Sequence, residues 1–155
     1  MHKIRVYLDT SVFGGVHDVE FAEVTKRFFA KVRQGTFVVL VSRLTTDELE
    51  DAPDEVSQVM KGLRAEQIEP VALNEEVRTL AEEYVKAGVL GEASIDDATH
   101  VAAATIAGAD LILSWNFRHI VNFSRICGFN SVNTRNGYRS MVILSPREVI
   151  DDNPE

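Results

Sequence analysis

The sequence predicts an α/β fold, in which a mostly parallel sheet is covered by helices on both sides. Apolar runs of strand length alternate along the chain with stretches whose apolar residues recur at helical spacing. Two of these runs, residues 37–41 and 111–113, are continuously apolar, as in strands that are buried on both faces. Because the 155 residues contain no internal repeat and no Gly/Ser linker, we expect one domain, residues 1–155.

Each element is predicted from its periodicity and from the signals at its ends. Gly35 and Gly108 end the helices before them, and Asn74 caps a third helix. Ser94 with Asp97 three positions later resembles a capping box. The expected elements, in chain order, are a strand at 4–8, a helix at 21–32, a strand at 37–41, a helix capped by Thr45 or Thr46, a helix from Pro53, a strand at 68–73, a helix from Asn74, a helix at 94–107 and strands at 111–113 and 141–144.

Composition excludes several classes of protein. A hydrophobic content of 45% and a charged content of 26% are typical of globular proteins, not of disordered or collagen-like chains. The longest apolar stretches are too short to span a bilayer, and no secretory leader is recognisable. Cys127 is the single cysteine, so no intrachain disulfide can form, and we expect its side chain to pack in the core. We therefore expect a cytoplasmic protein without a membrane segment.

The charge of the chain is unevenly distributed. A net charge of −8 argues against a protein that binds nucleic acid by bulk electrostatics. Residues 111–147, however, contain five arginines and no Asp or Glu, and aromatic residues lie between the arginines. Such a segment can lie against a phosphate backbone, with Arg118 and Arg139 as candidate RNA contacts. It can equally be a solvated arginine face whose aromatic rings lie in the core, or a surface for a charged protein partner.

Oxygen-bearing side chains follow the predicted strands at several places. Asp9 closes the first strand, Asn116 follows the strand at 111–113, and Glu48 lies in the first turn of the helix after the second strand. Asp96 and Asp97 lie at the start of a helix. Open α/β sheets bind their ligands at the carboxyl ends of strands, and oxygen ligands suit a hard divalent cation such as Mg²⁺ or Mn²⁺. The sequence therefore favours a metal-dependent enzyme that cleaves phosphodiester bonds.

Each of these residues also has a purely structural explanation. Asp9 can form an Asx turn, and Glu48 can simply stabilise a helix through the helix dipole. Asp96 and Asp97 can both be residues that favour the helix dipole. Asp97, however, shares a helix face with small apolar residues that can pack on a sheet, which favours a place at the sheet edge for its carboxylate. His100 is a candidate ligand or base, although a histidine on an alanine-rich helix is more often buried and hydrogen-bonded.

Four segments, taken together and in order, resemble the PIN-domain family, whose typical members are ribonucleases and include the toxins of VapBC-type toxin–antitoxin pairs. The segments are 6–13 with Asp9, 44–49 with Glu48, 97–104 with Asp97 and 109–120 with Asn116. The resemblance implies a three-layer α/β/α sandwich with a central, mostly parallel sheet. It also favours Asp97 over Asp96 as the second aspartate of the site.

The resemblance further implies a function. Asp9, Glu48, Asp97 and Asn116 would hold Mg²⁺ or Mn²⁺ and position the water that attacks RNA. The protein would be an endoribonuclease, the toxin of a type II toxin–antitoxin system, with an antitoxin partner and a homodimeric state. Asn116 departs from the aspartate of many relatives, and the loss of one charge should weaken a second cation more than the first. The alternative is a non-catalytic module that binds RNA or protein and keeps a degenerate metal site.

Overall fold

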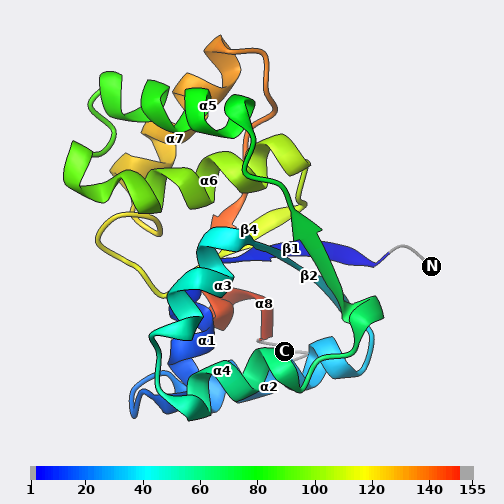
Figure 1. Ribbon diagram of the computed structural model, residues 1–155. Coiled ribbons are helices and arrows are strands. Elements are labelled where there is room, and N and C mark those ends of the chain that lie inside the picture. Colours follow the sequence, from blue (N-terminus) through cyan, green and yellow to red (C-terminus); the bar gives the residue numbers. More distant parts are fainter. Residues whose placement is uncertain (1–2, 151–155) are drawn as a thin grey trace, which may run out of the picture.

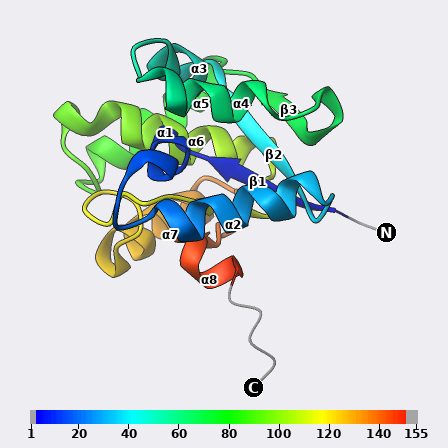
Figure 2. The same ribbon diagram turned by 90° about the horizontal axis from the view of Figure 1, so that it is seen from below.

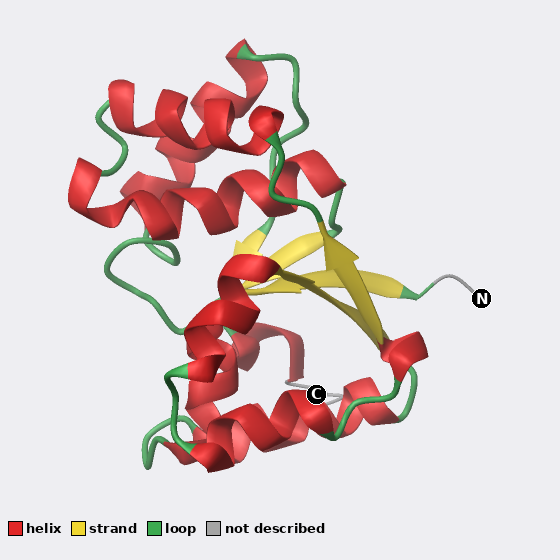
Figure 3. Ribbon diagram, viewed as in Figure 1, coloured by secondary structure: helices red, strands yellow, loops and turns green. Residues whose placement is uncertain are grey.

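A parallel sheet between two layers of helices forms the fold, as the sequence predicts (Figure 1, Figure 3). The computed structural model describes residues 3–150, so residues 1, 2 and 151–155 of the expected domain lie outside the described residues. The described strands are β1 (Ile4–Leu8), β2 (Phe37–Ser42), β3 (Ile68–Val71), β4 (Leu111–Leu113) and β5 (Ile143–Leu144). Their order is β3-β2-β1-β4-β5, and every neighbouring pair is parallel.

Helices cover both faces of this sheet. They are α1 (Thr10–Gly14), α2 (Ala22–Arg33), α3 (Arg43–Glu50), α4 (Asp54–Lys61), α5 (Glu75–Lys86), α6 (Ile95–Ala107), α7 (Phe123–Arg135) and α8 (Pro146–Ile150), with short 3₁₀ turns η1 (Gly15–His17), η2 (Ala65–Gln67) and η3 (Glu92–Ser94). The helices α5, α6 and α7 lie on one face, and α1, α2, α4 and α8 lie on the other (Figure 1, Figure 2). None of the helices in the described range is long and apolar enough to cross a membrane.

The core is divided by the sheet because successive side chains of a strand point to opposite faces. Tyr7 and Leu40 pack on the side of α5, α6 and α7, whereas Leu8 and Val39 pack on the side of α2 and α8. All four side chains are fully buried. Burial on both faces explains why the second strand is a continuous apolar run rather than an alternating one.

Some predicted helix ends are confirmed and others are wrong. The side chain of Asn74 accepts a hydrogen bond from the backbone N–H of Val77, and Gly108 ends α6 in the left-handed conformation, with φ of 69°. Neither Thr45 nor Thr46 caps α3, because the helix begins before both of them, at Arg43. Glu48 therefore lies in the second turn of α3 rather than the first.

Two further expectations about local structure are wrong. The side chain of Ser94 makes no capping hydrogen bond to α6, so the predicted capping box with Asp97 does not form. Cys127 lies on α7, for which no helix was expected, and its side chain is exposed. The physical reason is its helical position: two residues before the buried Phe129, it faces away from the core.

A tight contact joins the turn η1 to the segment after β4. Trp115 Nε1 donates a hydrogen bond of 2.9 Å to Thr25 Oγ1 in the buried interior. Gly15 lies directly against both groups. A Cβ atom at this position would lie 2.5 Å from Thr25 Oγ1 and 2.7 Å from Trp115 Nε1, so any larger residue must displace one of them.

We expect Gly15→Ala to lower the free energy of unfolding by about 1–3 kcal/mol, the usual cost of overpacking a core. Urea denaturation followed by circular dichroism measures this difference. Gly14→Ala is the matched control, because its Cβ would meet no heavy atom within 4 Å and its backbone is right-handed helical. Equal losses of stability in the two variants would contradict the steric explanation.

Candidate active site

The candidate site lies where the order of the strands reverses. The chain runs outward from β1 to β2 and β3, and then returns to place β4 on the other side of β1. In open parallel sheets, the crevice outside the carboxyl ends of strands at such a reversal is the usual place for a ligand. Asp9 follows β1 directly, and Ser114 follows β4, so both stand at this reversal.

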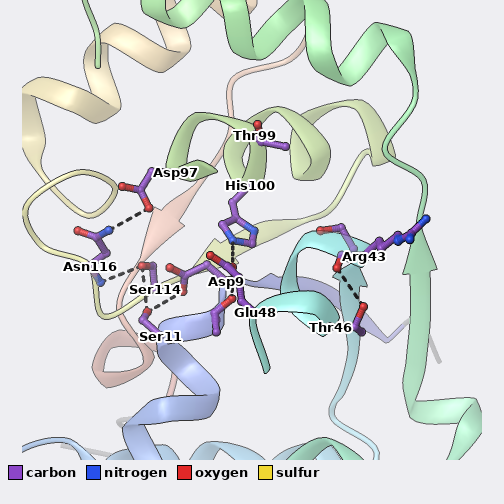
Figure 4. Close-up of polar contacts among 12 residues, drawn as sticks. Asp9, Ser11, Arg43, Thr46, Glu48, Asp97, Thr99, His100, Ser114 and Asn116 are labelled. Carbon is purple, nitrogen blue, oxygen red and sulfur yellow. Dashed lines mark hydrogen bonds and ion pairs between the residues drawn. The ribbon is translucent and has the colours of Figure 1, made fainter. Parts of the chain in front are cut away.

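Asp9 is buried and held by hydroxyl groups. Asp9 is only 4% exposed, and Ser11 Oγ donates a hydrogen bond of 2.6 Å to its Oδ1. Ser11 Oγ in turn accepts from the backbone N–H of Trp115 at 2.9 Å and lies 3.4 Å from Ser114 Oγ (Figure 4). These contacts tie the end of β1 to the end of β4 and fix the direction of the Asp9 carboxylate.

Asp97, at the start of α6, is held by the loop after β4. Asn116 Nδ2 donates to Asp97 Oδ1 at 3.2 Å, and His119 Nδ1 lies 3.0 Å from Asp97 Oδ2. Asn116 Oδ1 accepts from the backbone N–H of His119 at 2.9 Å, and Asn116 N–H donates to Ser114 Oγ at 2.9 Å. Both oxygens of Asp97 are therefore engaged across the crevice, which explains why it does not form the capping box with Ser94.

Glu48 ends a chain of buried polar groups. Its Oε1 accepts a hydrogen bond of 2.5 Å from Thr10 Oγ1 and lies 3.0 Å from His100 Nε2. His100 Nδ1 lies 2.7 Å from the Tyr7 hydroxyl, which lies 2.8 Å from Ser42 Oγ. The His100 side chain is only 3% exposed. This chain connects the interior of the sheet to the carboxylate on α3.

Burial and hydrogen bonding shift two of these carboxyl groups in opposite directions. Burial raises the pKa of Asp9, and the negative charge of Asp97 adds to the rise, against the opposing effects of His100 and of the serine hydroxyls. The hydrogen bond with His100 lowers the pKa of Glu48, with a second contribution from Thr10 and against the effect of burial. Glu48 is therefore stabilised as a carboxylate, whereas the charge on Asp9 is costly.

The donors of this site fit a hard divalent cation by chemical type. Carboxylate oxygens and the amide oxygen of Asn116 come from four separate segments, and Asp97 and Asp9 repel each other. Among residues 3–150, no three His, Cys, Asp or Glu side chains already stand together as a metal-binding group. The carboxylate oxygens bond instead to hydroxyl, amide and imidazole groups, which a cation would have to displace in part.

The structure brings the four residues predicted for the site to one end of the sheet. Asp9, Glu48, Asp97 and Asn116 lie near the carboxyl ends of β1 and β4 (Figure 4). Asp96 is exposed and, within the described part of the chain, has no hydrogen-bond or ion-pair partner. The geometry thus favours Asp97 of the two adjacent aspartates.

The two arginines predicted to contact RNA lie in different places. Arg118 is exposed in the loop after Asn116, at the site. Arg139 is also exposed but precedes β5, so it lies at the amino end of the parallel sheet, away from the site. Asp110 lies at that same amino end, where its carboxylate accepts from the backbone N–H of Arg5 at 2.8 Å. Asp110 is therefore too far away to replace Asn116.

Two polar side chains of the site were not expected from the sequence. His119 lies within the basic segment 111–147, and no pattern in the sequence singles out Ser114. The signal that could have found His119 is its spacing, because a side chain three residues after Asn116 can turn back across a short loop. The sequence allows His100 to be a ligand or base, or a buried, hydrogen-bonded residue. In the structure His100 is buried and hydrogen-bonded, and one of its contacts is with Glu48.

The fold is similar to that of solved VapC-type structures. VapBC2 from Rickettsia felis, solved with a DNA fragment from its promoter, matches with a TM-score of 0.59 at 10% identity, over 92% of this chain and 98% of that chain. Mycobacterium tuberculosis VapC20, a toxin that cleaves the sarcin–ricin loop, matches with a TM-score of 0.53 at 15% identity, over 88% and 98%. No protein-family model and no curated protein matches the sequence. The likeness shows that the chain has the PIN-domain fold.

The pKa shifts predict opposite effects of two neutralising substitutions in metal-free buffer. Because the folded protein binds a proton at Asp9 more tightly than the unfolded chain does, wild-type stability falls as the pH rises through the raised pKa. Asp9→Asn should therefore be more stable than the wild type at pH 7, and this difference should shrink as the pH falls. Glu48→Gln should be less stable than the wild type at pH 7, and this difference should also shrink in acid, since the lowered pKa of Glu48 contributes stability only while the group is ionised.

Urea unfolding between about pH 4 and pH 8, with EDTA present, measures both differences. Each variant serves as the control for the other, because both substitutions replace a carboxylate by its amide. A loss of stability of similar size in both variants at pH 7 would contradict the assigned shifts.

Proposed function

We propose that this chain is a metal-dependent endoribonuclease that hydrolyses phosphodiester bonds in RNA. The observation that supports this function best is the convergence of Asp9, Glu48 and Asp97 with Asn116 at the reversal point of the sheet. Carboxylates that repel one another, as Asp9 and Asp97 do, suit a site for a cation better than a purely structural arrangement. The fold likeness to a toxin that cleaves the sarcin–ricin loop agrees with this proposal.

The chain's own residues have distinct roles in this proposal. Asp9, Glu48, Asp97 and the amide oxygen of Asn116 would hold Mg²⁺ or Mn²⁺. When bound, such a cation lowers the pKa of a water and stabilises charge on the scissile phosphate. His100 favours the ionised form of Glu48 and holds its Oε1 in place. Asn116 contributes no charge, so the set of three carboxylates suits one cation better than two.

We propose further that the protein is the toxin of a type II toxin–antitoxin pair. The support is the likeness over nearly the whole chain to VapBC2, which was solved with promoter DNA, and to the toxin VapC20. The partner would be an antitoxin protein that blocks access to the crevice. The homodimeric state implied by the resemblance stays a prediction, which sedimentation equilibrium of the purified chain tests.

The function is tested by a ribonuclease assay on mixed RNA in Mg²⁺ or Mn²⁺, with EDTA as a control. We expect Asp97→Asn to lower cleavage by more than about 100-fold, because it removes a proposed ligand rather than a group that only supports one. Asp96→Asn is the matched control. It makes the same chemical change at the neighbouring position, where the carboxylate is exposed, and should leave cleavage unchanged.

Cleavage by the wild type that persists in EDTA, or equal losses in the two variants, would contradict the proposal. A wild type that binds RNA but does not cut it would favour the non-catalytic module instead. The feature in favour of that module is Asn116, at the position where the resemblance to the PIN-domain family implies an aspartate in many members.

Cation binding is measured separately by isothermal titration calorimetry with Mg²⁺ or Mn²⁺ and no RNA. We expect binding to the wild type and a loss of at least about 10-fold in affinity for Asp9→Asn, since the substitution removes a charged oxygen ligand. Asp110→Asn is the control, because that carboxylate lies at the opposite end of β4. Equal affinities for the wild type and Asp9→Asn would exclude Asp9 as a ligand.

A further inference from the structure

Three aromatic rings contact one another beside the candidate site. Trp115 and Phe117 stand on either side of Asn116 in the sequence. The Trp115 ring stacks on Phe21 with centroids 4.1 Å apart and an interplanar angle of 14°. Phe117 contacts the Trp115 ring edge-on at 6.1 Å and the Phe21 ring at 6.2 Å. Trp115 is only 6% exposed, whereas Phe117 is 43% exposed, so Phe117 forms the outer surface of this cluster.

The backbone that carries Phe117 is fixed on both sides. Trp115 is held through its backbone N–H by Ser11 at 2.9 Å and through its ring N–H by Thr25 at 2.9 Å. The N–H of Phe117 donates to the carbonyl of Trp115 at 3.0 Å, and the N–H of Ile120 donates to the carbonyl of Asn116 at 3.1 Å. The half-exposed ring therefore lies on a loop that is already ordered. Binding of a ligand to the ring then loses little conformational entropy of the loop.

Two arginines lie beside this cluster of rings. Arg118 is the next residue and is exposed, and the guanidinium of Arg147 lies 5.5 Å from the centroid of the Trp115 ring. No Asp or Glu occurs anywhere in residues 111–147. An exposed aromatic face next to arginines suits a ligand with flat rings and negative charge, which is the chemistry of single-stranded nucleic acid.

We propose that Phe117 is a stacking platform for an unpaired base of the RNA, next to the bond that is cleaved. The proposal rests on the proposed function and adds the residue that recognises a base of the substrate: the RNA must offer an unstacked base at the site. In a duplex the faces of the bases are covered by their neighbours, and only an unstacked base offers its face to an aromatic side chain. Arg118 and Arg147 would contact the adjoining phosphates.

A binding experiment on the full chain tests this in EDTA, so that no cleavage is needed. A labelled single-stranded RNA of about six nucleotides is titrated by fluorescence anisotropy, beside a chain of equal length without bases. Trp115 is the single tryptophan of the sequence, so a change in its emission locates the RNA at this cluster. We expect the RNA with bases to change this emission and the baseless chain to leave it unchanged.

Substitutions identify the ring that is responsible. Phe117→Ala should weaken binding of the RNA by about 5- to 100-fold, the range found when one stacking ring is removed, and Phe117→Tyr should retain affinity. Phe123→Ala is the matched control. Phe123 is 85% exposed in the same segment but, among the described residues, contacts no other aromatic ring, and its loss should leave the affinity unchanged. Circular dichroism and urea unfolding check that each variant folds.

The outcomes separate this inference from the proposed function. If Phe117→Ala binds RNA as the wild type does, or if the baseless chain binds equally well, the platform is excluded, whatever the ribonuclease assay shows. If Phe117→Ala changes the sedimentation of the protein but not its affinity for RNA, the ring belongs to a protein interface and the inference is overturned. Failure of the proposed function appears elsewhere, as RNA binding that depends on Phe117 without metal-dependent cleavage by the wild type.

Discussion

The burial of a carboxylate at the end of the central strand is the constraint on which the rest of the site depends. β1 lies between β2 and β4, so Asp9 at its end is shielded by both neighbours and is only 4% exposed. An ionised carboxylate in such a place needs hydrogen bonds or a neighbouring cation. Ser11 and Ser114 supply hydroxyls from the two adjacent strand ends, and His100 supplies electrostatic compensation from α6. The local sequence after Asp9 and the return of the chain to β4 thus both help to stabilise the buried carboxylate.

The other two carboxylates are supported by separate sets of groups, and these sets differ in kind. Glu48 is contacted from the protein interior by the buried ring of His100. Asp97 is contacted from the surface loop by Asn116 and by a partly exposed His119. A group fixed from the interior keeps its direction when a ligand enters. A group fixed by a loop can exchange its partners at lower cost, because loop contacts open more readily than core contacts. If a cation binds, we therefore expect Glu48 to keep its position and its hydrogen bonds. We expect Asp97 to exchange its hydrogen-bond partners.

The parts of the structure that the sequence predicts are those set by local patterns. Strand ends follow from apolar runs, so the place of Asp9 at the end of β1 could be predicted directly. Glu48 was expected one helical turn too early, because the start of α3 is set by where β2 ends and not by a Thr cap. His119 has only one weak signal in the sequence, its spacing of three residues from Asn116, since its contact with Asp97 depends on how the loop folds. The basic segment suggested Arg139 as an RNA contact, but only the parallel topology reveals that this residue lies at the other end of the sheet.

The loop from Ser114 to His119 connects the two halves of the site and also carries the surface beside it. Ser114 bonds to Asn116 of the same loop and lies beside the Ser11 hydroxyl that holds Asp9. Asn116 donates to Asp97, and Phe117 is partly exposed next to Arg118. Because one short segment makes all these contacts, a change at any of them shifts the others, and effects of paired substitutions within it should not add. Asn116 suits this position better than an aspartate would in one respect. Its amide N–H groups can donate to Asp97, whereas a fourth carboxylate there would repel it and loosen the loop that positions the aromatic ring.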